Sequence, residues 1–144
     1  MAFDLRCGWD LNRSDHRACV WRYLEQERPL LIVGSPERRA FSALQSLTSG
    51  SPNYRATLRE GLNRLRFMMD IYSWQIRRGG WFLHEQPWPS CSWNLDMVTT
   101  ISSRPDVMTA RCDQCMFGQW TWGPDNCMKF ARKATGPMTH CQEN

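Results

Sequence analysis

The most regular hydrophobic pattern in the chain is an apolar stripe with helical spacing. Apolar residues recur there at alternating steps of four and three, which places them on one side of a long helix. They are Leu58, Leu62, Leu65, Met69, Tyr72 and Ile76, and Gly79-Gly80 follows as a stop signal. A second helix is expected from Ser14 to Glu27, where Ser14 with Asp15 supplies the N-cap and Arg28-Pro29 ends the pattern.

Short apolar runs on either side of the long helix predict strands. Residues 30–33 form a continuous apolar run closed by Gly34-Ser35-Pro36, a pattern typical of a strand covered on both faces, so we expect it at the centre of a sheet. Further strands are predicted at residues 3–5, 81–84 and 107–110. Strands that alternate with helices indicate βαβ units with right-handed crossovers. The fold class expected is therefore α/β, a small and truncated Rossmann-like parallel sheet with flanking helices.

Length and composition fit a single domain. The 144 residues are 42% hydrophobic and 22% charged, without a low-complexity tract, so one domain over residues 1–144 is expected. After Cys112 the sequence loses any period, which predicts an irregular tail rich in Cys and Trp over residues 112–144. The eight Trp residues either fill the core or form stacking surfaces.

Charge and cysteine content bear on the partners and the cellular compartment of the protein. The formal net charge of +4 permits contact with a nucleic acid but does not require it, because the basic residues are scattered. No apolar signal segment follows Met1, and no apolar run approaches the roughly 20 residues of a membrane span. With seven Cys, an odd number, we expect an intracellular protein, cytoplasmic or nuclear, with free or metal-bound thiols and no membrane contact. The oligomeric state is left open.

Three polar groups follow predicted strands. They are Asp4, Ser35-Pro36 and Glu85. In open α/β sheets ligands bind at the carboxyl ends of the strands, where loops and helix N-termini converge. We therefore expect these groups to line one cleft.

Five blocks of the sequence resemble one family. In chain order they are DLRCGWDL, RPLLIVGSPERRAFSALQ, GGWFLHEQPWPSCSW, ARCDQCMFG and RKATGPMTH. They resemble a methyltransferase-related domain of retroelement-type polyproteins, whose pattern runs GSP-x-C-T-x-F-S, GR-x-FLHEHP-x-x-A-x-SW, D-x-C-x-[FY]-G and KKPTGFMTN. That domain is in turn distantly similar to the cytosine-5 DNA methyltransferases. The resemblance covers nearly the whole chain.

The resemblance implies a degenerate catalytic site. In the family, a Cys two residues after Pro36 would add to a flipped base, while Glu85 would hydrogen-bond to the ring and protonate it. Arg38 stands at that Cys position, and a guanidinium cannot act as a nucleophile because it stays protonated. The site expected is thus Glu85 with Ser35, Pro36 and Arg38, without a nucleophile.

The resemblance also bears on the cofactor, S-adenosylmethionine. Asp4 would match the acidic residue near the cofactor ribose, but no glycine-rich turn precedes it. We therefore expect the N-terminal cofactor-binding unit to be missing. The chain is then either a fragment of a longer polyprotein or a domain that has given up the cofactor.

Two other chemistries stay open. Cys112 and Cys115 have the spacing of a zinc knuckle, which Cys127 with His140 or Cys141 would complete. The family pattern accounts for Cys115 without a metal, and buried free thiols are the default. Weak nucleic-acid contact would need basic and aromatic residues on one rim. The candidates are Arg38, Arg39, Trp88, Arg132 and Lys133.

The leading functional hypothesis is a non-catalytic remnant of a methyltransferase-like domain from a mobile-element polyprotein. It would bind no cofactor, contact nucleic acid weakly and have the rest of the polyprotein as a partner. One alternative is an S-adenosylmethionine-dependent cytosine methyltransferase activity on nucleic acid in a longer parent or complex, with Glu85 contributing. The other is a zinc-dependent interaction module built on Cys112 and Cys115.

Overall fold

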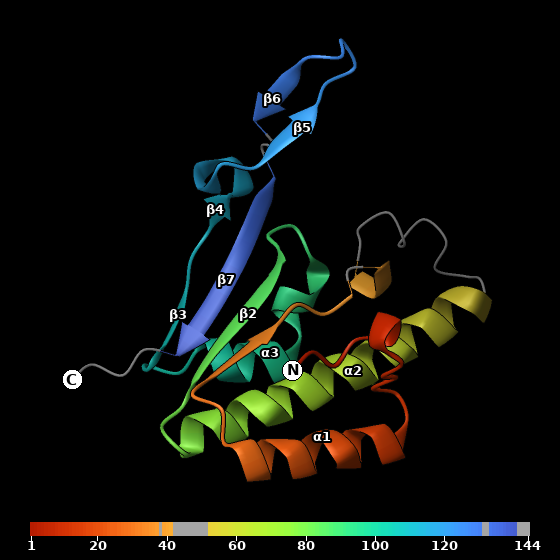
Figure 1. Ribbon diagram of the computed structural model, residues 1–144, viewed down its shortest axis with the longest axis vertical. Helices are drawn as coiled ribbons and strands as arrows, with labels where there is room; N and C mark the ends of the chain where they lie inside the picture. The colour runs from red at the N-terminus through yellow and green to blue at the C-terminus, as the bar shows by residue number, and fades with distance from the viewer. Residues whose placement is uncertain (38, 42–51, 131–132, 141–144) are drawn as a thin grey trace.

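The chain forms a mixed α/β structure. A computed structural model describes residues 1–37, 39–41, 52–130 and 133–140, with only the backbone described at residues 39 and 52. Within these ranges three α-helices pack with one mixed sheet, and a two-stranded ribbon projects away from that body (Figure 1). The helices are α1 (Ser14–Glu27), α2 (Pro52–Arg77) and α3 (Asp96–Ser102).

The main sheet contains one parallel strand pair. Its strands are β1 (Leu31–Gly34), β2 (Trp81–Pro87), β3 (Val107–Thr109), β4 (Cys112–Asp113) and β7 (Ala134–His140). The order is β1-β2-β7-β3, and β4 also pairs with β7. Strands β1 and β2 are parallel and joined through α2, as expected for a βαβ unit, whereas β7 runs antiparallel to β2, β3 and β4.

The expectation of an all-parallel sheet is therefore corrected. Strand β7 inserts between β2 and β3, so these two are not direct neighbours. It comes from the segment that we expected to be irregular, and this expectation is wrong for residues 120–122, 128–130 and 134–140, which form strands. Its sequence, ATGPMTH, has no alternation of apolar and polar residues. Its place in the sheet depends on hydrogen bonding to strands on both sides, which the strand propensities of its own residues do not predict.

Two further strand predictions are corrected. Strand β1 is an edge strand and not a central one: Leu31 and Val33 are 50% and 64% exposed. Residues 3–5 form no strand. Instead Leu5–Cys7 is a short 3-10 helix that Asp4 caps by accepting a hydrogen bond of 2.7 Å from the backbone N–H of Arg6. The expectation that Asp4 follows a strand is therefore wrong.

The helix predictions are confirmed in their essentials. Helix α1 spans the expected residues and ends where Arg28 adopts a left-handed conformation with φ of 45°. Its N-cap is Arg13 and not Ser14, and Asp15 pairs with Arg13 at 2.7 Å. Helix α2 includes the whole predicted apolar stripe.

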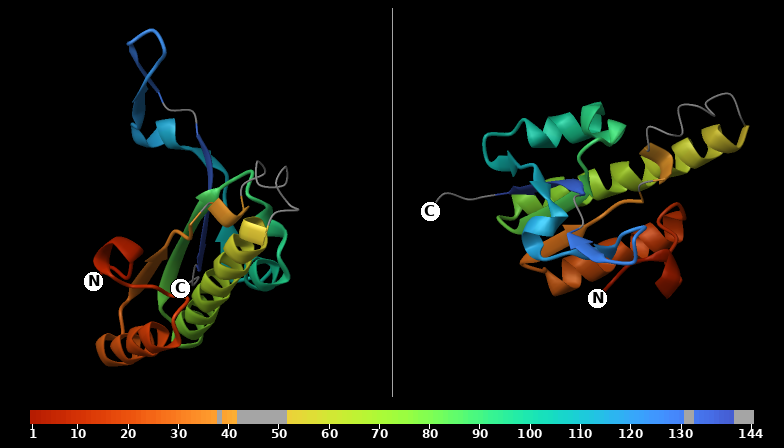
Figure 2. Two further views of the ribbon diagram at one scale, coloured as in Figure 1. Left: turned by 90° about the vertical axis from the view of Figure 1, so that its right-hand side faces the viewer. Right: turned by 90° about the horizontal axis from the view of Figure 1, so that it is seen from above.

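The core lies between the sheet and the helices α2 and α3, which occupy the same side of the strands (Figure 2). Leu65, Met69 and Tyr72 of α2 pack there. Facing them are Phe82 of β2, Val98 of α3 and Met138 of β7. A second cluster joins Val20 and Leu24 of α1 to Phe67 and Ile71 on another side of α2. Helix α2 is thus the element around which both clusters form.

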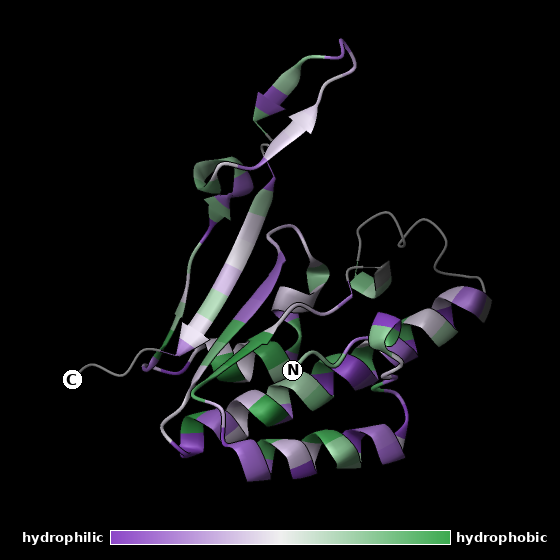
Figure 3. Ribbon diagram, viewed as in Figure 1, coloured by the Kyte–Doolittle hydropathy of each residue, from purple (hydrophilic) through white to green (hydrophobic). Residues whose placement is uncertain are grey.

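The opposite face of the sheet carries several exposed apolar side chains. Its exposed side chains belong to β1, β2 and β3, and all are at least half exposed: Leu31 50%, Val33 64%, Trp81 53% and Met108 61%. Strand β1 is strongly hydrophobic along its length (Figure 3). Among the described residues, none of the helices combines the length and the hydropathy that crossing a bilayer requires.

Candidate functional site at the ends of β1 and β2

The parallel pairing of β1 and β2 brings Ser35 and Glu85 together. The register aligns Gly34 with His84, so the residue after each of these lies at the same edge of the sheet. The hydroxyl of Ser35 donates a hydrogen bond of 2.9 Å to Oε2 of Glu85. The strand-end reasoning from the sequence thus identified two groups that are in contact.

A third group, Thr135 of β7, holds the other carboxylate oxygen. Its hydroxyl donates to Oε1 of Glu85 and lies 3.2 Å from the backbone oxygen of Gln86. Thr135 is only 6% exposed, so this contact is fixed within the sheet. Sequence reasoning gave Thr135 no role, although it lies in the RKATGPMTH block. The missing signal was the antiparallel β7, which aligns Thr135 with Pro87.

The residues on either side of Glu85 point to the opposite face of the sheet, because successive side chains of a strand alternate. His84 and Gln86 are buried there at 0% and 1% exposure. The hydroxyl of Tyr72 lies 3.2 Å from Nδ1 of His84, and Ser92 donates to Oε1 of Gln86. Burial lowers the pKa of His84 to about 4, against smaller opposing effects of Gln86 and Glu85. His84 is therefore a neutral packing histidine at pH 7.

The end of β1 packs directly on α2. A Cβ at Gly34 would overlap the hydroxyl of Tyr72 and the terminal methyl of Met68. Only glycine allows this approach. Between the end of β1 and α2 there is accordingly no room for an added side chain.

The loop after β1 is tied to the same helix. Glu37 pairs with Arg64 of α2 at 2.9 Å, and the Arg64 side chain is only 15% exposed. Glu37 therefore anchors this loop to α2. Arg38 lies outside the described residues. Arg39 begins the 3-10 helix η2 (Arg39–Phe41), in which Ala40 and Phe41 are buried.

Trp88 and Lys133 lie beside the paired ends of β2 and β7. The backbone N–H of Trp88 donates a hydrogen bond of 3.1 Å to the backbone oxygen of Ala134, the residue after Lys133. The Trp88 ring packs beside Trp93 over Gly136, where a Cβ would come within 3.0 Å of Trp88. Trp88 keeps 38% of its surface exposed. Arg132, the other basic candidate here, lies outside the described residues.

The candidate zinc ligands are not gathered. Among residues 1–37, 39–41, 52–130 and 133–140, no group of three or more His, Cys, Asp or Glu side chains is placed to hold a metal ion. Cys112, Cys115 and Cys127 are free cysteines, and the Cys112 sulfur lies 3.9 Å from the backbone oxygen of Thr135. His140 lies elsewhere in the sheet, with Nδ1 3.1 Å from the oxygen of Gly80 and Nε2 3.4 Å from Asp106. Cys141 lies outside the described residues.

No protein-family model matches the chain, and neither the curated proteins nor the solved structures gave a match.

Proposed function

We propose that this chain is a non-catalytic remnant of a methyltransferase-like domain, of the kind found in mobile-element polyproteins, with a Rossmann-like ancestry. The resemblance of its five sequence blocks to that family motivates the proposal. The observation that carries it is the state of Glu85, whose two carboxylate oxygens accept hydrogen bonds from Ser35 and Thr135 of its own fold.

The chemistry of base methylation explains why that state matters. A base-methylating enzyme of this type needs a thiolate to attack the ring and a carboxyl group that exchanges a proton with it. Arg38 offers only donors at the position of the thiol. The Glu85 carboxylate serves as the acceptor in an internal hydrogen-bond cluster. In this proposal the cluster stabilises the sheet and performs no catalysis.

Weak nucleic-acid contact is the second part of the proposal. Trp88 offers a half-buried ring with an exposed surface, and its backbone N–H donates a hydrogen bond to the oxygen of Ala134, the residue after Lys133. A ring for stacking beside a cation for phosphate is the minimal arrangement for contact with a single strand. Arg38, Arg39 and Arg132 would add charge to that rim.

Calorimetry with S-adenosylmethionine is the first test. The proposal expects no saturable heat of binding. As a second step, Arg38→Cys restores the family residue and is incubated with S-adenosylmethionine and a duplex that contains 5-fluorocytosine. No covalent protein–DNA band is expected. Saturable cofactor binding, or a band that depends on the restored Cys, would overturn the remnant and favour the methyltransferase alternative.

The nucleic-acid contact is tested by measuring how much labelled single-stranded DNA the protein retains at several salt concentrations. Trp88→Ala and Lys133→Ala should each weaken binding, and Arg38→Ala with Arg39→Ala should reduce its salt dependence. Trp81→Ala removes a more exposed ring, 53% against 38% for Trp88, on the open sheet face and is the control. Equal binding by Trp88→Ala and the wild type would remove this rim from the proposal.

A further inference from the structure

The ribbon outside the main sheet has one apolar face and one polar face. Strands β5 (Trp120–Trp122) and β6 (Met128–Phe130) pair antiparallel. Trp120 is opposite Phe130 and Trp122 is opposite Met128, so these four side chains share one face. Thr121 and Lys129 form the other face. We call the four-residue side the ribbon's apolar face.

The apolar face is exposed although the ribbon itself is well formed. Its four side chains are exposed to 48% (Trp120), 71% (Trp122), 56% (Met128) and 57% (Phe130). The rings of Trp120 and Phe130 stack at 3.8 Å between centroids. The turn is closed by a hydrogen bond of 2.9 Å from Gly123 to Cys127, with Asn126 in the left-handed conformation that Asn tolerates. The surface is thus pre-organised but has no cover within the described chain.

Such a ribbon calls for a partner on physical grounds. An isolated two-stranded ribbon is at best marginally stable in water. Contiguous exposed apolar patches on proteins mark interaction surfaces. The ribbon projects away from the sheet and helices, so those elements do not supply the cover (Figure 1).

The charges of the ribbon indicate a protein surface and not a nucleic acid. A surface that stacks on bases combines rings with cations that follow the phosphates. Here the apolar face has no ionisable side chain, and Lys129 projects from the other face, where it pairs with Asp125 at 2.6 Å. An uncharged flat face also does not repel a copy of itself.

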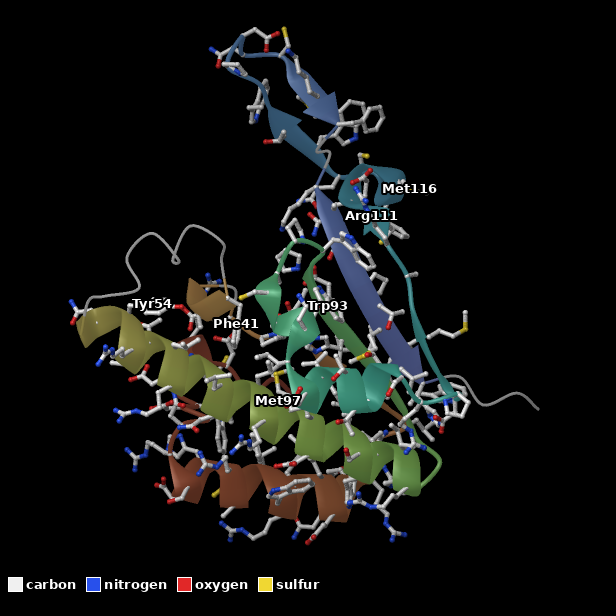
Figure 4. The ribbon with its side chains drawn as sticks, turned by 180° about the vertical axis from the view of Figure 1, so that it is seen from behind. Phe41, Tyr54, Trp93, Met97, Arg111 and Met116 are labelled. Atoms are coloured by element: carbon white, nitrogen blue, oxygen red, sulfur yellow. The ribbon has the colours of Figure 1, made fainter. Side chains whose placement is uncertain are left out.

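We propose that the apolar faces of two copies pack against each other around a two-fold axis. Two ribbons stacked face to face give a small four-stranded sandwich with the usual sheet separation of about 10 Å. Met116 lies near the base of the ribbon (Figure 4), and Met116 and its neighbour Phe117 are 74% and 77% exposed. Scaled by their exposed fractions, the six side chains offer about 770 Å² of apolar surface per copy, taking about 200 Å² for each fully exposed large side chain. This matches the approximately 800 Å² per partner of a standard specific interface.

Sedimentation velocity over a range of concentrations tests the dimer. The wild type should shift from monomer to dimer as concentration rises. Trp122→Thr with Met128→Thr replaces two of the four side chains of the apolar face with polar ones and should raise the dimer dissociation constant at least tenfold. Thr121→Val with Lys129→Gln changes the opposite face of the same strands, and should leave that constant within about twofold. Far-UV circular dichroism and the unfolding midpoint check that all variants keep the folded body.

Three results would overturn the proposal. The first is a monomer at every concentration up to the solubility limit. The second is a dimer that survives Trp122→Thr with Met128→Thr but is lost with Val33→Thr, since the open sheet face would then be the interface. The third is a monomer whose single-stranded DNA binding depends on Trp122, which would assign the ribbon to nucleic acid.

Discussion

The two faces of the main sheet are made by the same strands but have opposite environments. Toward α2 and α3, Phe82, His84 and Met138 are fully buried. On the other face, Val33 and Met108 are 64% and 61% exposed, although both are as apolar as the buried residues. Trp81 and Phe82 are consecutive in β2, yet Trp81 is 53% exposed and Phe82 is 0% exposed.

This difference shows what an apolar run does and does not encode. The run at residues 30–33 was sufficient to predict a strand, because strands tolerate apolar residues on both sides. It did not reveal which face the helices cover. A residue's contribution to stability therefore depends on the face it occupies. Substitutions on the two faces should differ by several kcal/mol in their effect on the free energy of unfolding.

The largest effect is expected from Phe82→Ala on the covered face. Phe82 is fully buried and its ring stacks on Tyr72 at 4.4 Å between centroids. Loss of a buried phenyl ring leaves a cavity and costs about 3–5 kcal/mol. Urea unfolding measures the loss. A cost below about 1 kcal/mol would contradict the buried position of β2.

A pH dependence of nearly the same size is expected from His84. Burial lowers its pKa from 6.5 to about 4 in the folded state, so folding favours the neutral ring. The unfolded chain binds the extra proton first, and stability that is present above pH 6.5 is lost as the pH falls toward 4. The loss approaches about 3 kcal/mol. Urea midpoints measured between these pH values should slope less in His84→Gln than in the wild type, and equal slopes would contradict the assignment.

A smaller loss is expected from Glu85→Gln on the open face. The carboxylate accepts from Ser35 and Thr135, whereas an amide keeps only one acceptor oxygen. Removing one charge-assisted hydrogen bond costs about 1–2 kcal/mol. Ser35→Ala removes one donor and should cost less than the change at Glu85. Thermal unfolding of both variants measures the order, and a stabilised Glu85→Gln would mean that the carboxylate is strained by its surroundings.

The smallest effect is expected from Val33→Thr. The side chain is exposed, and the substitution keeps a β-branched residue in the strand, so stability should change by less than about 0.5 kcal/mol. The same urea series as for Phe82→Ala measures it. A loss comparable to that of Phe82→Ala would show that the open face is covered in solution.

The sequence predicted the elements whose apolar residues recur with a regular local spacing. The stripe from Leu58 to Ile76 predicted α2, and the shared edge of two parallel strands predicted that Ser35 and Glu85 would be close. Strand β7 could not be predicted in this way, because ATGPMTH contains Gly and Pro and lacks alternation. Thr135, which completes the Glu85 cluster, was missed for the same reason. Asp4 was misplaced because the apolar residues on either side of it, Phe3 and Leu5, suggested a strand where a short helix begins after Asp4.

The position of β7 also determines when this protein can fold. Strand β7 is the last described element of the chain, yet it fills the gap between β2 and β3. During synthesis the ribosome therefore releases β1, α2 and β2 long before the strand that pairs with the free edge of β2. A nascent chain must keep that edge from other strands until β7 has been synthesised. A chaperone bound to the edge would protect it during this interval, and fast translation of the segment between β2 and β7 would shorten the interval.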